Sequence, residues 1–169
     1  MKNYLLFFLC VVWASAIAAQ TKKNINSTNK KCAIVYLPNY YKEKGVIFDK
    51  DYVVGIDMRT LKYRYTPTID DVTKAEEIFS KQYNQLQGKD VDVKKFFCHW
   101  VRQYVGLVDS SGNKNIIVQL INNAKPRKIN RLLGKDWETD FVIMLSDSFY
   151  DVSTIFRINI DTDQITTEL

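Results

Sequence analysis

The helical periodicity of residues 68–88 constrains the fold more than any other feature of this chain. Apolar residues recur there at three- and four-residue intervals, which places them on one side of an α-helix. Thr68 can cap the first turn together with Asp71, and Gly88 can end the last turn. The pattern predicts an amphipathic helix of about five turns that must pack one stripe on an apolar surface. The stripe consists of Ile69, Val72, Ala75, Phe79, Tyr83 and Leu86.

Short runs rich in β-branched and aromatic residues predict strands on both sides of this helix. Residues 109–113 have the composition of a turn, so the strands on either side of them form a predicted hairpin. Strands, one helix and further strands joined by short turns favour an antiparallel sheet over parallel β-α-β units. The predicted strands are residues 32–37, 51–58, 61–65, 96–108, 115–121, 141–145, 152–160 and 165–169.

The expected fold class is therefore α+β, with one long amphipathic helix packed on a curved antiparallel sheet, cystatin-like or related. A hydrophobic content of 46% with 25% charged residues is typical of a folded chain. We find no internal repeat and no second apolar core that would call for another domain, so residues 32–169 form a single predicted α+β domain.

The amino-terminal residues predict export. Residues 1–19 have the order of a signal peptide, with Lys2 as the positive start, an apolar run over 4–13, and Ala16 and Ala18 near a cleavage site. The apolar stretch is shorter than the roughly 20 residues of a membrane-spanning helix, so no transmembrane span is expected after cleavage. Residues 20–31 are polar and lysine-rich, which predicts a flexible basic tether. The expected location is periplasmic or secreted.

Cys32 and Cys98 are the two cysteines beyond the predicted cleavage site. In an oxidising compartment they are candidates for a disulfide, which would stabilise the fold by about 4 kcal/mol on the chain-entropy model. If their strands are antiparallel neighbours, however, the two cysteines lie towards opposite ends of the pair. A disulfide and two separate buried thiols both fit the sequence.

Residues for common catalytic chemistry are sparse or badly spaced. His99 is the single histidine and directly follows Cys98, and neighbouring strand residues point to opposite faces, so a Cys-His dyad is disfavoured. Glycine-rich phosphate loops and zinc-ligand spacing are also missing from the sequence. We therefore predict no catalytic residue, no metal and no cofactor. A secreted hydrolase that uses dispersed carboxylates is the alternative, because such groups meet only in space.

Two features indicate binding. Residues 125–135 place a group of cations between two predicted strands, which would suit an acidic protein surface, a phosphate group or an anionic glycan. The alternative is a solvated crossing, and an exported chain is not expected to meet nucleic acid. Aromatic residues in predicted loops can anchor an interface. The candidate binding residues are Tyr40, Tyr41, Lys125, Arg127, Lys128, Arg131, Trp137 and Phe149, with Lys135 as a further cation.

The run R-Q-Y-V-G-L-V-D at 102–109, the turn after it, K-N-I-I-V at 114–118 and the T-P-T entry into the helix at 66–68 resemble small exported bacterial proteins of uncharacterised activity. This resemblance covers about half of the chain. It implies the same cystatin-like or related fold and a bacterial envelope setting, and it supplies no active-site residue. The expected function is an exported non-enzymatic binding domain, such as an inhibitor or immunity-type protein. A secreted hydrolase and a structural envelope component are the alternatives.

Overall fold

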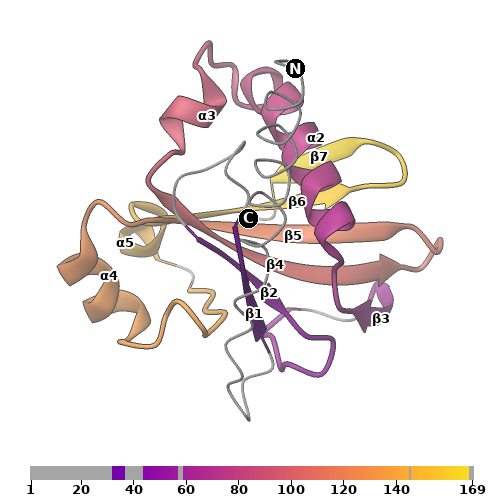
Figure 1. The fold of residues 1–169 in the computed structure, drawn as a ribbon, viewed down its shortest axis with the longest axis horizontal. Helices are drawn as coiled ribbons and strands as arrows, with labels where there is room; N and C mark the ends of the chain where they lie inside the picture. Colours follow the sequence, from indigo (N-terminus) through magenta and orange to yellow (C-terminus); the bar gives the residue numbers. More distant parts are fainter. Residues whose placement is uncertain (1–31, 37–43, 57–58, 145, 168–169) are drawn as a thin grey trace, which may run out of the picture.

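The computed structural model describes residues 32–36, 44–56, 59–144 and 146–167, and these form a seven-stranded mixed sheet with helices on both faces (Figure 1). The predicted signal peptide, the predicted tether, Tyr40 and Tyr41 lie outside the described residues. The described strands are β1 (Cys32–Val35), β2 (Gly45–Phe48), β3 (Leu61–Tyr65), β4 (Trp100–Asp109), β5 (Lys114–Asn122), β6 (Ser153–Asn159) and β7 (Gln164–Thr167). The described helices are α2 (Ile69–Gln87), α3 (Val93–Phe96), α4 (Pro126–Leu133) and α5 (Asp147–Tyr150).

The strand order is β1-β2-β4-β5-β6-β7, and β3 pairs with β4 off this path. β2 and β4 are parallel, with Gly45 beside Arg102 and Ile47 beside Tyr104, whereas the other strand pairs of the described residues are antiparallel. β3 pairs with residues 106–109, farther along β4. The predicted fold class, one long amphipathic helix on a curved antiparallel cystatin-like sheet, is therefore wrong. The sheet is mixed, and three short helices accompany α2.

α2 begins and ends where its capping residues lie. The Thr68 hydroxyl accepts a hydrogen bond from the Asp71 backbone N–H (3.1 Å), and the Asp71 carboxylate accepts one from the Thr68 backbone N–H (3.0 Å). This reciprocal pair is a capping box, which satisfies two amides at the helix start. Gly88 ends the helix with a φ of 58°, a left-handed conformation that glycine adopts without steric cost.

Each face of the sheet carries a hydrophobic core. Successive strand residues point to opposite faces, so alternate residues of β4 and β5 contribute to different cores. The first core joins the sheet to α2 and α3, and includes Val72, Ala75, Phe79, Tyr83, Phe97, Tyr104, Ile116, Val118, Leu120, Phe156 and Ile158. The second core joins it to α4, α5 and the segment between them, and includes Val101, Val105, Leu107, Ile117, Ile121, Ile129, Leu133, Trp137, Phe141, Phe149 and Ile155.

A buried ion pair links α2 to β4 inside the first core. Glu76 and Arg102 are each 1% exposed, and the Arg102 Nε lies 2.8 Å from the Glu76 Oε1. The Tyr104 hydroxyl donates to the same carboxylate oxygen at 2.8 Å, and an Arg102 Nη1 donates to the Trp100 carbonyl at 3.0 Å. Because buried charges need such partners, this group fixes α2 against one position of β4.

The strand predicted over residues 141–145, before α5, is wrong, because residues 141–144 form no strand. Side chains of the sheet take up its backbone groups instead. The Gln103 Nε2 donates to the carbonyls of Trp137 (2.6 Å) and Asp140 (3.1 Å), and the Gln119 Nε2 donates to the carbonyl of Val142 (2.8 Å). Two buried glutamines thus hold this segment over the second core without a strand ladder.

Two other predicted strands are also corrected. The second strand is β2 rather than residues 51–58, of which the described part, 51–56, forms no strand. β4 begins at Trp100 because the Asp92 side chain accepts from the Lys95 backbone N–H (3.1 Å) and starts α3. Among the described residues, no helix has the length and apolar composition needed to cross a membrane.

Candidate functional site

α4 presents the cation-rich segment that the sequence singled out. The segment is two turns of helix rather than an irregular crossing, with Pro126 in the first turn, a position where its missing N–H is not needed. Ile129 and Leu133, four residues apart, are buried in the second core. The Trp137 indole N–H donates to the Asn130 side-chain oxygen at 3.1 Å and joins the helix to the chain that follows it. Packing of one side therefore fixes which residues point outward.

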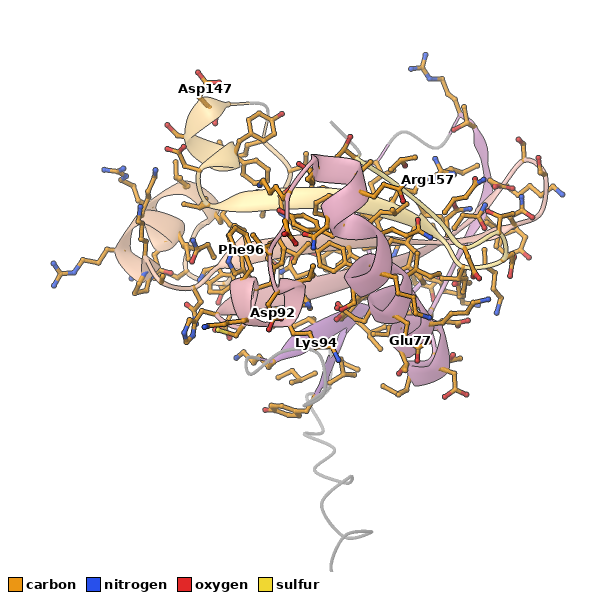
Figure 2. The ribbon with its side chains drawn as sticks, turned by 90° about the horizontal axis from the view of Figure 1, so that it is seen from above. Glu77, Asp92, Lys94, Phe96, Asp147 and Arg157 are labelled. Atoms are coloured by element: carbon orange, nitrogen blue, oxygen red, sulfur yellow. The ribbon has the colours of Figure 1, made fainter. Side chains whose placement is uncertain are left out.

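Four cations on and beside this helix are exposed: Lys125, Arg127, Arg131 and Lys135. We call these four residues the α4 basic surface. Within the part of the chain that the structure describes, none of them forms an ion pair with a carboxylate. Figure 2 shows nitrogen-tipped side chains extending from α4 away from the body of the molecule. This surface can therefore contact an anionic partner without first breaking an internal ion pair.

Lys128 differs from the other predicted binding cations because it points back to the protein. Its Nζ lies 2.7 Å from the Asp151 Oδ2, at the end of α5. The hydrogen bond and charge of Lys128 lower the pKa of Asp151, so this carboxylate is ionised at neutral pH. Lys128 thus ties α4 to α5 rather than offering a free charge.

The neighbourhood of the α4 basic surface is mixed in character. Tyr150, next to Asp151 in the chain, is 44% exposed, and Asp147 and Asp136 are exposed carboxylates of the same region. Figure 2 shows Asp147 on α5. Tyr150 is not among the predicted binding residues, although it lies beside Phe149 in the same predicted loop and is exposed.

Two predicted interface aromatics are core residues, so that part of the prediction is wrong. Trp137 is 5% exposed and Phe149 is fully buried, and both belong to the second core. The reason is that the chain after α4 folds back over the sheet, held by Gln103 and Gln119. No local sequence pattern encodes that return.

Neither Cys32 nor Cys98 forms a disulfide in the structure, and both residues are half-buried. Cys32 pairs with Phe48 at the end of β2, whereas the start of β2 lies beside the start of β4, which Cys98 precedes. β2 therefore separates the two cysteines and sets them towards opposite ends of the strands, and the candidate disulfide is not formed. His99 is exposed, and the described residues hold no cluster of three or more His, Cys, Asp or Glu side chains with metal-binding geometry.

Two surface hollows carry the carboxylates that a hydrolase would need. One, of about 390 Å³, lies at the start of α2 and includes Asp71 and Asp161 in its lining. Burial raises the pKa of Asp71, but hydrogen bonds from Thr68 and the charge of Lys114 outweigh this and lower it, so Asp71 is poorly suited to donate a proton. The other, of about 380 Å³, lies between α2 and α3. Its lining includes Glu77, Asp92 and Lys94, which Figure 2 labels.

Comparison of the chain with family models, with curated proteins and with solved structures found no match.

Proposed function

We propose that this chain is an exported, non-enzymatic binding domain that docks on an acidic surface of another protein through the α4 basic surface. Such a domain would act in the periplasm or outside the cell by occluding its partner, as inhibitors and immunity-type proteins do. The observation that carries the proposal is that the four cations of the α4 basic surface, which lie on and beside a packed helix, are exposed and form no ion pair within the described residues.

The surroundings of α4 favour a protein partner over a polyanion. Arginine and tyrosine are enriched at protein interfaces, and this region offers Arg127, Arg131 and the half-exposed Tyr150. The carboxylates Asp136 and Asp147 would repel a continuous phosphate or sulfate backbone, whereas a protein surface can place its own cations opposite them.

A preformed helix also favours tight docking. Ile129 and Leu133 are buried in the second core, and the Lys128–Asp151 ion pair joins α4 to α5. Because the helix is already ordered, binding would immobilise side chains only, which reduces the entropic cost of association.

Charge reversal on α4 tests the proposal. We expect the immobilised protein to retain acidic proteins from bacterial envelope extracts, and Arg127→Glu/Arg131→Glu to reduce the affinity for them at least about tenfold, the effect of roughly 1.4 kcal/mol. The measurement is affinity capture with mass spectrometry, followed by titration of each captured protein.

The matched control is Lys81→Glu/Lys95→Glu, which makes the same charge change on α2 and α3, the helices of the other face. It should leave capture unchanged. Three outcomes would contradict the proposal. The two variants could lose capture equally, the α4 variant could capture the same proteins as the unaltered protein, or the unaltered protein could capture none.

A further inference from the structure

Two arginines on α4 share one outward side. Arg127 and Arg131 are four residues apart, and residues at this spacing on a helix lie one above the other with roughly 5–6 Å between their Cβ atoms. Both are exposed, while Ile129 and Leu133 of the same helix face the second core. The two arginine side chains therefore leave the same side of the helix, one turn apart.

The cation that turns inward is a lysine, and the two that remain outward on the helix are arginines. Lys128 forms an ion pair with Asp151, with 2.7 Å between the lysine Nζ and the aspartate Oδ2. An arginine presents a planar fork that binds both oxygens of one carboxylate, whereas a lysine acts as a point charge. A pair of forks at this spacing matches two carboxylates at the same spacing, which is the arrangement of Asp or Glu at positions i and i+4 of a helix.

We propose that the partner contacts α4 with an acidic helix that presents Asp or Glu four residues apart, one carboxylate for Arg127 and one for Arg131. This inference rests on the proposed function and names the chemistry of its partner. The buried side of α4 fixes the helix from which both arginines extend, so the surface should distinguish the spacing of the partner's charges and not only their number.

The test uses two stapled alanine-based peptides of identical composition and verified equal helicity. One places its glutamates at i and i+4, and the other at i and i+2, so that they point to diverging sides. Titration into the ¹⁵N-labelled protein at low salt, followed by NMR, should show the i,i+4 peptide binding at least fivefold tighter, with shifts at residues 125–135.

Arg127→Lys/Arg131→Lys keeps both charges and removes both forks, so it should abolish the preference between the peptides. Lys81→Arg/Lys95→Arg on the other face should leave it intact. Equal binding of the two peptides, a preference that survives the lysine variant, or tighter binding of a heparin oligosaccharide or of polyphosphate would overturn the inference. If the peptides bind equally while charge reversal still abolishes capture, the acidic helix is wrong and the proposed function stands.

Discussion

Gly106, in the middle of β4, illustrates how one residue can decide whether two strands approach. It pairs with Tyr65 of β3. A Cβ at position 106 would lie 2.5 Å from the Tyr65 carbonyl oxygen, 2.9 Å from the Tyr65 Cε1 and 3.0 Å from the Pro67 Cγ. The tyrosine ring and the proline occupy the space that a side chain would take, so only glycine fits here.

We therefore expect Gly106→Ala to lower the free energy of unfolding by about 1–3 kcal/mol, because the nearest atom belongs to the backbone and cannot rotate away. Thermal denaturation followed by circular dichroism measures the effect. Gly55→Ala is the control, since no atom lies within 4 Å of its added Cβ. A Gly106→Ala protein as stable as the Gly55→Ala protein would disprove the close approach.

Removal of Glu76 should be among the most damaging single changes. Glu76→Leu leaves the Arg102 charge buried without its carboxylate and removes the acceptor of the Tyr104 hydroxyl. This change should lower the free energy of unfolding, measured by urea denaturation, by about 3–5 kcal/mol. The triple variant Glu76→Leu/Arg102→Met/Tyr104→Phe replaces the whole group by apolar residues and should recover most of that loss. A single variant that loses less than 1 kcal/mol would contradict the role of the ion pair.

At the scale of elements, the start of α2 depends on Thr68. Thr68→Ala removes one half of the capping box and should destabilise the protein by about 1 kcal/mol. Thr68→Ser retains the hydroxyl and should restore nearly all of it. Chemical denaturation of the two variants side by side measures the difference, and equal loss in both would show that the hydroxyl does not act as a cap.

Elements encoded by neighbouring residues could be predicted from the sequence. The helix and both of its caps are found where the Thr68, Asp71 and Gly88 pattern predicts them, and β4 and β5 pair on either side of the 109–113 turn. Each of these depends on contacts between residues close in sequence. The cations of residues 125–135 are likewise neighbours in the chain, and their role as a binding site stays a prediction.

Arrangements set by distant residues could not be predicted. β2 pairs with β4 across an intervening strand and two helices, and no periodicity of residues 45–48 specifies a parallel partner. Residues 141–144 have strand composition, yet Gln119 binds their backbone from the sheet. The burial of Trp137 and Phe149 follows from the same long-range packing, which is why aromatic residues in a predicted loop were mistaken for surface residues.

At the scale of the whole molecule, two carboxylates make the free energy of unfolding depend on pH in the acid range. Burial raises the pKa of Asp71 and Asp109, but hydrogen bonds from Thr68 and Lys114 to Asp71, and from Asn113 and Asn115 to Asp109, outweigh burial and lower both pKa values. The unfolded chain therefore binds more protons than the native chain as the pH falls through this range. Their contribution to stability is present above the unfolded pKa and is lost as pH falls through the folded pKa.

We expect the free energy of unfolding to change little from these groups between pH 7 and 5 and to fall below about pH 4, as measured by urea denaturation at each pH. Asp71→Asn/Asp109→Asn should be less stable at pH 7 and show a shallower decrease in acid. Asp70→Asn, at an exposed position of the same helix, serves as the control. An acid decrease as steep in the double variant as in the wild-type protein would argue against these carboxylates.

β2 and β3 both pair with β4, and this arrangement has a consequence for the order in which the strands assemble. β4, β5 and β6 follow one another as antiparallel neighbours, whereas residues 49–99 separate β2 from the strand beside which it lies. Closing so long a loop costs more chain entropy than forming a hairpin, so β1 and β2 should join last and detach first. A chain that stops before residue 100 retains only β1 with β2 among the strand pairs described, and α2 then has no sheet on which to bury its stripe.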